Sequence, residues 1–402
     1  MTMKLVARLW LLMICSGVEA APLLFQNFGE TIELQKEGQH YLLPGTNHRV
    51  EVASRLIVKV SPTINPGDFS KAAQAIGRTS VLFEADPFRY VQITLRDSID
   101  IRTAMKTASG LPGVSLVQPD ILQLNYPSKS VNTSAPVVNR RNRFNLADRL
   151  DNAPGEGVRV AIIDDGFDLS HPALSHIDPI FEFDLSRRQM GAAPVSPQDT
   201  HGTQVAGVIF ALYQHDARLN GLAPQAQFIA LRQPDSWTSN SLLAFQLAAL
   251  AGADVLNCSW HTDLLLEPVA DAVNSLSKEG RDGRGMAVVF ASGNENRIIT
   301  ADDNEASIDS AIVVGAADHQ GKRLPFSNHG NSIDLMAPGT PVSTTQYGGG
   351  QGPFGGTSLS AAIVTGTAAL ILSEQPTLSL QNLKLELDKI FKRYNTGVTE
   401  DP

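Results

Sequence analysis

The chain has the length and composition of a globular protein with an acidic charge balance. Its 402 residues, 43% of them hydrophobic, suffice for two or three domains with sizeable cores. The formal net charge of −9, together with the lack of a long Lys/Arg block, argues against nucleic acid as a partner.

The first twenty residues have the three parts of an export signal. Lys4 and Arg8 precede an apolar run over 9–18, and Val18-Glu19-Ala20 fits a small-x-small cleavage site. The run is too short to span a bilayer as a permanent helix. We therefore expect a signal peptide over residues 1–20, no stable membrane span, and a secreted or periplasmic protein. The alternative is a cytosolic start with a buried first helix.

Residues 55–120 follow the order strand, helix, strand, strand, helix, strand. The strands are expected at 56–60, 81–83, 90–95 and 114–117, and the helices at 68–76 and 99–108. This order predicts a small α+β domain of the split βαβ type. Such a fold serves many functions, so it carries little functional information by itself. Two further candidate strands are 31–34 and 41–43.

The segment 127–143 separates this domain from the rest of the chain. It is rich in Pro, Ser and Asn and ends in Arg140-Arg141-Asn142-Arg143. Too little apolar surface is present to offset the entropy of ordering it, so we expect an exposed linker. An exposed linker is also a target for proteolysis.

From Gly157 onward, strands alternate with helices, as expected of a parallel sheet covered on both faces. In such sheets the chemistry lies at the carboxyl ends of the strands. Strands are expected at 159–163, 227–231, 254–258, 286–291 and 311–316, and helices at 202–213, 241–251 and 267–278.

Four polar residues lie at strand ends or helix starts in this region. Asp164 ends one strand, Asn294 follows another, His201 opens a helix, and Ser358 follows Gly-Gly-Thr before an apolar run. Singly, each has an ordinary explanation as a cap or turn residue. Together they have the functional groups that acyl transfer needs. Ser358 would be the nucleophile, His201 the base, and Asp164 the residue that orients His201. Asn294 and the Ser358 N–H would hold the oxyanion.

These motifs resemble those of the subtilisin-like serine protease (subtilase) family, in its chain order Asp, His, Ser. The resemblance covers roughly residues 157–372 and includes Leu335-Met336-Ala337-Pro338-Gly339. The three family signatures and the oxyanion segment correspond to Ile163-Asp164-Asp165-Gly166 with His171-Pro172, His201-Gly202-Thr203-Gln204-Val205-Ala206-Gly207, Gly356-Thr357-Ser358-Leu359-Ser360, and Ala291-Ser292-Gly293-Asn294-Glu295.

The resemblance implies an α/β fold with a three-layer parallel sheet and helices on both faces, preceded by a small α+β propeptide domain. It implies a serine endopeptidase, a hydrolase that forms an acyl-enzyme intermediate and is made as a zymogen. Expected partners are protein or peptide substrates and the chain's own propeptide as an intramolecular inhibitor. No cofactor is expected. The implied domains are signal peptide 1–20, propeptide 21–126, linker 127–143 and peptidase 144–402.

The expected substrate-binding residues are Ser259, Trp260, His261 and Gly293. The first three stand, with Thr262, where family members often have Ser-Leu-Gly-Gly, on an edge strand expected to pair with substrate. Bulky Trp260 and His261 would narrow the substrate cleft.

Other positions also depart from the family pattern. Ala362-Ile363 replaces a Pro-His pair, and Gln204 replaces a common His. Ala173 stands where many members carry a calcium-ligating Asp, so we expect no metal site.

An acidic loop bears on specificity. Asp302, Asp303 and Glu305 fall near the base of the expected pocket for the side chain before the scissile bond. Either the loop is simply solvated, or one carboxylate receives a Lys or Arg side chain. Cleavage at 140–143 would suit the second interpretation, whereas a propeptide junction near Tyr126 would not.

Two other functional classes remain open. A catalytically weak pseudoprotease that acts as a binding or scaffold protein is the main alternative. An esterase or amidase with the same triad lacks the Gly-x-Ser-x-Gly motif of the hydrolase fold.

Overall fold

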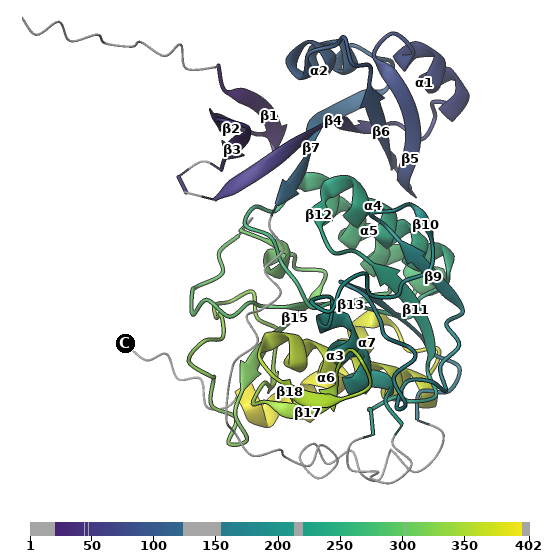
Figure 1. The fold of residues 1–402 in the computed structure, drawn as a ribbon, viewed down its shortest axis with the longest axis vertical. Coiled ribbons are helices and arrows are strands. Elements are labelled where there is room, and N and C mark those ends of the chain that lie inside the picture. Colours follow the sequence, from purple (N-terminus) through teal and green to yellow (C-terminus); the bar gives the residue numbers. More distant parts are fainter. Residues whose placement is uncertain are drawn as a thin grey trace, which may run out of the picture.

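The computed structural model describes residues 21–43, 45, 46, 48–123, 154–212, 220–301 and 303–395, without the side chains of 392–395. The expected signal peptide, the linker and Asp302 lie outside this part of the chain. The described residues form an N-terminal α+β domain and a larger second domain built on a parallel sheet (Figure 1).

The N-terminal domain contains the order strand, helix, strand, strand, helix, strand that the sequence predicts. Its four main strands are arranged β5-β6-β4-β7, with antiparallel pairing throughout. Asn65 caps the first helix and Asp100 the second, each with its side chain accepting from backbone N–H groups. The elements are β4 (Arg49–Val60), α1 (Pro66–Ala73), β5 (Gly77–Ala85), β6 (Phe88–Leu95), α2 (Ile101–Ser109) and β7 (Val114–Gln123).

Three more strands precede this unit. They are β1 (Leu23–Asn27), β2 (Glu30–Glu37) and β3 (His40–Leu42), each antiparallel to the next, and β3 pairs with β4. Leu23, Phe25 and Leu34 alternate with exposed residues and are buried, which is the period of a sheet with one covered face. Both candidate strands near the start of the chain are therefore confirmed.

The second domain is a three-layer α/β domain. Its sheet has the order β10-β9-β11-β8-β13-β14-β15-β16, parallel except for β10 with β9. Helices α3, α6 and α7 pack on one face, and α4 and α5 cover the other. The strands are β8 (Arg159–Asp164), β9 (Phe181–Asp184), β10 (Gln189–Met190), β11 (Gln227–Arg232), β12 (Ser236–Trp237), β13 (Val255–Cys258), β14 (Ala287–Ala291), β15 (Ile312–Ala317), β16 (Leu335–Pro338), β17 (Val342–Thr345) and β18 (Gln351–Phe354).

In the second domain, two predicted helices end several residues away from the expected position. The helices are α3 (His201–Phe210), α4 (Thr238–Leu250), α5 (Glu267–Gly283), α6 (Thr357–Glu374) and α7 (Leu380–Asn395), with a 3₁₀ turn at Glu305–Ser307. α3 stops at Phe210 because Ala211 turns to ψ 139°. α5 runs past the predicted end at 278, but Gly280, Arg281 and Asp282 leave helical geometry within it.

α6 is the centre of the second domain. Its mean hydropathy of 1.3 over 18 residues would suit a membrane span by composition, yet 89% of that stretch is buried. It packs against α3, α7 and strands β13–β16. Among the described residues α6 is the one helix of this kind, and its apolar surface is covered by protein.

The N-terminal domain rests on α4 and α5 (Figure 1). Its last strand, β7, pairs antiparallel with β12, so Gln123 faces Ser236 across the strands. The buried Asp120 accepts from the backbone N–H and hydroxyl of Ser239 at 3.0 and 2.7 Å. Lys59 lies 2.6 Å from Asp271. The two domains are thus joined by strand pairing and by hydrogen bonds to buried groups.

A close helix–strand contact gives a stability prediction. A Cβ atom at Gly207 would overlap the hydroxyls of Thr344 and Thr345 on β17, and Thr345 already donates to the Thr203 carbonyl at 2.6 Å. We expect Gly207→Ala to lower the free energy of unfolding by about 1–3 kcal/mol, the usual cost of overpacking.

Urea unfolding in a Ser358→Ala background measures this change. Gly350→Ala is the matched control, because a Cβ at Gly350 meets nothing within 4 Å. Equal stability of the two variants would contradict the prediction.

Candidate active site

Asp164 and His201 meet where β8 ends and α3 begins. β8 is buried almost throughout, so its terminal carboxylate lies at the rim of the core with 5% of its surface exposed. His201 Nδ1 lies 2.9 and 3.0 Å from the two Asp164 oxygens. The helix can approach this closely because Gly202 has no side chain: a Cβ there would lie 2.5 Å from the Gly166 carbonyl oxygen.

Asp165 holds the first turn of α3. Its Oδ2 accepts from the His201 N–H at 3.1 Å and its Oδ1 from the Gly202 N–H at 2.8 Å. A carboxylate is favoured at this position because helix N-termini carry unpaired N–H groups and partial positive charge. Thr200, the residue before the helix, makes no such side-chain bond. Asp165 therefore fixes the backbone from which the His201 imidazole projects.

The two carboxylates set the protonation of His201. Burial acts to lower the pKa of His201, but the Asp164 charge and hydrogen bond, with the Asp165 charge, outweigh it and leave the pKa raised. Burial and the neighbouring Asp164 charge in turn raise the pKa of Asp165 to about 7. His201 is thus a stronger base than an isolated histidine.

Ser358 lies in the first turn of α6, one residue after Thr357. Its Oγ donates to the Ser259 carbonyl at 3.2 Å. The ring of His201 makes an edge contact with Phe354, which ends β18 just before the Gly-Gly turn, at 5.5 Å between centroids. His201 thus contacts the end of β18, shortly before Ser358 in the chain, and Ser358 contacts the segment that follows β13.

Asn294 is oriented by the residue before Ser358. Its Oδ1 accepts from the Thr357 N–H at 3.0 Å and from the Thr357 hydroxyl at 3.1 Å. Its Nδ2 is buried and, within the described residues, has no hydrogen-bond partner; the same holds for His201 Nε2. Buried polar groups are normally paired, so a ligand group that bonded to these two atoms would satisfy them.

Trp260 does not narrow the cleft as expected. Its indole is buried, with 5% exposed, and Nε1 donates to the Ile163 carbonyl at 3.1 Å. The ring also makes an edge contact with Phe290 at 5.7 Å. The part of that expectation that concerned Trp260 was wrong, because its side chain packs into the sheet face under α4 and α5. Ser259 lies beside Ser358, and His261 lies beside Gly293.

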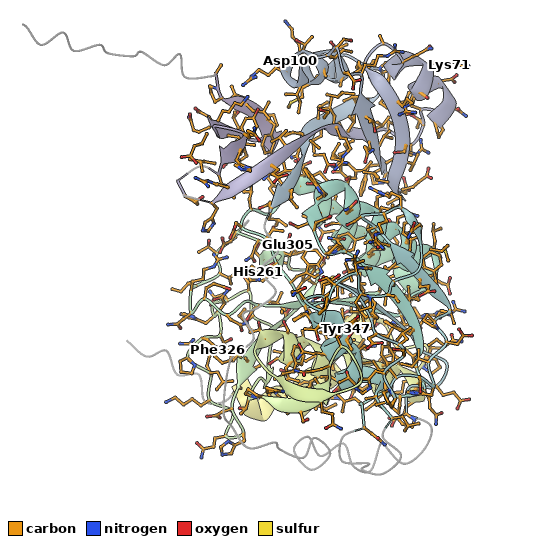
Figure 2. All side chains as sticks on the ribbon, viewed as in Figure 1. Lys71, Asp100, His261, Glu305, Phe326 and Tyr347 are labelled. Atoms are coloured by element: carbon orange, nitrogen blue, oxygen red, sulfur yellow. The ribbon has the colours of Figure 1, made fainter. Side chains whose placement is uncertain are left out.

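The acidic loop is not simply solvated. Glu305 is buried, and its carboxylate accepts from the N–H and hydroxyl of Thr262 at 2.7 and 2.8 Å. Burial raises the pKa of Glu305. Asp303 pairs with Arg297 at 2.5 Å. Figure 2 shows Glu305 and His261 in the part of the second domain that faces the N-terminal domain.

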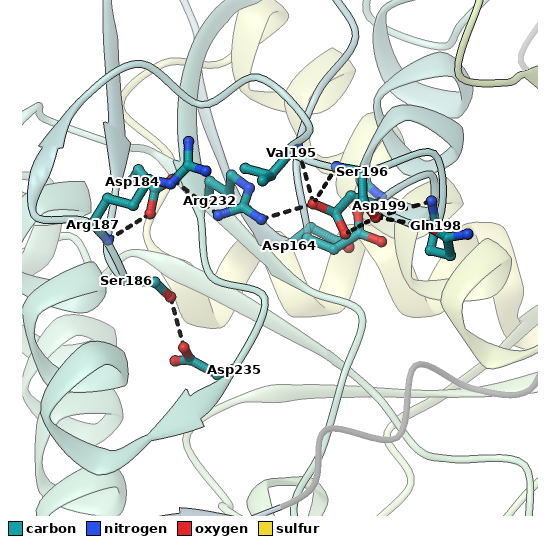
Figure 3. A network of polar contacts seen from close by, with 12 residues as sticks. Asp164, Asp184, Ser186, Arg187, Val195, Ser196, Gln198, Asp199, Arg232 and Asp235 are labelled. Atoms are coloured by element: carbon teal, nitrogen blue, oxygen red, sulfur yellow. Dashed lines mark hydrogen bonds and ion pairs between the residues drawn. The ribbon is translucent and has the colours of Figure 1, made fainter.

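Sequence reasoning missed an ion-pair network behind the site. Arg232, at the end of β11, donates to Asp184 at 2.9 Å and to Asp199 at 2.7 Å (Figure 3). The next residue, Gln233, donates its N–H to the Asp164 carbonyl at 2.6 Å. The network ties the loop before His201 to the sheet. The one feature of the sequence that could have indicated this network is the charged Arg232 at the end of an apolar strand.

Comparison with known proteins identifies the family. A sequence profile of the subtilase family (Peptidase_S8) matches residues 155–388. The chain is 34% identical over 240 residues to subtilisin E of Bacillus subtilis, covering 56% of this chain and 57% of that one. It is 33% identical to the subtilisin of Bacillus pumilus, covering 79% of it. The chain therefore belongs to the subtilase family of subtilisin-like serine proteases, and the match spans little more than half of subtilisin E.

A solved structure shares the fold over most of the chain. Fervidolysin from Fervidobacterium pennivorans, described as a keratinolytic enzyme related to subtilisin, aligns with a TM-score of 0.64 at 20% identity. The alignment covers 89% of this chain and 58% of fervidolysin. The predicted three-layer fold is confirmed by this likeness and by the sheet described above.

The charge of Asp165 yields a titration prediction. We expect Asp165→Asn to lower the pKa of His201, because the imidazolium loses a stabilising negative charge. NMR titration of the histidine ring protons measures this shift, with His201→Gln to assign the resonance. Asp68→Asn, in the N-terminal domain, is the control and should leave the value unchanged. An unchanged or higher pKa in Asp165→Asn would contradict the assignment.

Proposed function

We propose that this chain is an exported serine endopeptidase that is made as a zymogen and acts through Asp164, His201 and Ser358. The observation that carries the proposal is the pair of buried orphan atoms, His201 Nε2 and Asn294 Nδ2. One is a proton acceptor and the other a hydrogen-bond donor, which are the two functions that a serine nucleophile requires.

The reaction follows from these positions. Ser358 Oγ attacks the carbonyl carbon of the substrate as its proton passes to His201 Nε2, and Asn294 Nδ2 and the Ser358 N–H stabilise the oxyanion. His201 then gives the proton to the departing amine, which leaves an ester on Ser358. Water, deprotonated by His201, hydrolyses this ester and restores the serine.

Asp164 has an electrostatic and an orienting role. Its contacts with Nδ1 keep the proton on that nitrogen, so the lone pair of Nε2 faces the nucleophile. Its charge raises the pKa of His201, which favours the imidazolium formed during attack.

The N-terminal domain serves as an intramolecular inhibitor in this proposal. β7 pairs antiparallel with β12, a two-residue strand outside the parallel sheet, and backbone pairing of this kind is how an extended peptide adds to an exposed strand. The side-chain amide of Gln123 also makes two hydrogen bonds to the backbone of Leu264. Its Nε2 donates to the Leu264 carbonyl at 2.8 Å, and its Oε1 accepts from the Leu264 N–H at 2.9 Å. The end of β7 thus approaches the segment that carries Ser259 and His261. The signal-like sequence at residues 1–20 supports export.

A binding protein on the same fold is the alternative. The observation that favours it is that the Ser358 hydroxyl donates to the Ser259 carbonyl. Labelling by a fluorophosphonate separates the two functions, because only an activated serine reacts.

We expect Ser358→Ala to abolish fluorophosphonate labelling and detectable casein hydrolysis. The loss in kcat should be on the order of 10⁶, as it is when subtilisin loses its nucleophile. Protein yield and circular dichroism should match the parent, because one buried hydroxyl is removed. Ser373→Ala, at the far end of α6, is the control and should keep full activity. Undiminished hydrolysis by Ser358→Ala would refute the mechanism.

Two substitutions of Asn294 distinguish a role in stabilising the oxyanion from a role in holding the Thr357 backbone. Asn294→Ala removes the donor and the acceptor, whereas Asn294→Asp keeps an oxygen for the Thr357 N–H. We expect both to lower kcat by about 10²–10³ with little change in KM, the magnitude quoted for an oxyanion donor in subtilisin. If Asn294→Asp kept parental kcat, Asn294 would act only by holding Thr357.

A further inference from the structure

We propose that His261 fills the pocket that would receive the substrate side chain immediately before the scissile bond, so that the enzyme cleaves after small residues such as Gly, Ala and Ser. The inference rests on the proposed endopeptidase function and adds a substrate class to it. Its basis is the position of the imidazole between two segments that flank the nucleophile.

The place of this pocket follows from the reacting atoms. The carbonyl carbon that is attacked must lie at Ser358 Oγ, and its oxygen must lie at Asn294 Nδ2. Ser358 Oγ is 3.2 Å from the Ser259 carbonyl oxygen, and Asn294 directly follows Gly293. The side chain on the attacked residue therefore enters between the segments 259–261 and 292–294.

Three side chains already converge in that space. A Cβ atom at Gly293, where φ is +101°, would lie 2.9 Å from His261 Cε1 and 2.5 Å from Glu295 Oε2, and would overlap Asn328 Nδ2. His261 itself is 2% exposed. The imidazole thus reaches from its own segment toward the backbone of Gly293, which leaves little space for a long substrate side chain.

Hydrogen bonds on both sides hold this arrangement. The residue after His261, Thr262, is fixed by two bonds to the buried Glu305. On the other side, Asn328 Nδ2 donates to Glu295 Oε2 at 2.7 Å and to the Ser292 carbonyl at 2.8 Å. His261 Nε2 lies 3.6 Å from the same Glu295 oxygen. Moving the imidazole aside would mean disturbing both sets of bonds.

Within the described part of the acidic loop, the carboxylates that could attract a basic substrate side chain are engaged. Asp303 is paired with Arg297, and Glu305 is bound to Thr262 within the core. Glu295 lies 3.6 Å from His261 Nε2, and it accepts from Asn328. A long Lys or Arg side chain would have to displace His261 to reach it.

The test compares substrates that differ at one residue. Peptides Ala-Ala-Pro-X-p-nitroanilide, with X as Ala, Phe or Arg, are assayed with enzyme from the full-length chain, and kcat/KM is expressed per fluorophosphonate-labelled serine. We expect the parent to prefer Ala over Phe and Arg by about tenfold or more, since a few carbon atoms in a filled pocket have effects of this size. In His261→Gly, kcat/KM for Phe should rise by about tenfold or more relative to Ala.

His176→Gly is the matched control, because His176 contacts the Pro224 carbonyl away from this pocket. It should keep the parental ratios. If His261→Gly does not fold, His261→Ala is used, and cleavage of casein by the parent, mapped by mass spectrometry, provides an independent measurement.

Several outcomes overturn the inference. It fails if the labelled parent prefers Phe or Arg, if its casein cuts follow large residues, or if a labelled His261 variant keeps the parental ratio. In each case labelling of Ser358 shows that the protease function stands. If the parent is neither labelled nor active, the proposed function fails, and the inference fails with it.

Discussion

The close seating of α3 on the end of β8 is the constraint on which the site depends. Gly202 allows the contact, and Asp165 locks it with two hydrogen bonds to the first N–H groups of the helix. His201 thereby meets Asp164 without any long side chain having to bridge the gap. Because the Asp165 charge also adds to the rise in the pKa of His201 that Asp164 mainly causes, this one carboxylate affects both the position and the basicity of the imidazole.

Ion pairs and hydrogen bonds in the surrounding structure hold the segments beside this junction in place. Arg232 pairs with carboxylates on β9 and on the loop that leads into α3. Taking a guanidinium out of water is costly unless its hydrogen bonds are replaced, and the pairs with Asp184 and Asp199 replace two of them. On the other side, Thr357 fixes Asn294 while its neighbour Ser358 contacts Ser259. The rim is therefore built from short links between adjacent elements.

Sequence reasoning located what is local and missed what depends on packing. Strand ends and helix starts are marked by nearby residues, so Asp164, His201, Ser358 and Asn294 could be proposed as site residues from short motifs. Trp260 was misjudged because its sequence neighbours do not reveal that its indole reaches the carbonyl of Ile163. Likewise, the burial of Glu305 by Thr262 follows from the folding of two segments about 40 residues apart. Such contacts leave no periodic signal along the chain.

The pairing of β7 with β12 also affects how other peptides compete for β12. A strand joined covalently to the segment that it pairs with binds it at an effective concentration set by the connecting chain. Any peptide that needs the same backbone groups of Ser236 and Trp237 must compete with this concentration. Once the chain is cut between the two domains, the same contacts become a bimolecular equilibrium that weakens on dilution. A single cut between the two domains would thus make the pairing of β7 with β12 depend on protein concentration.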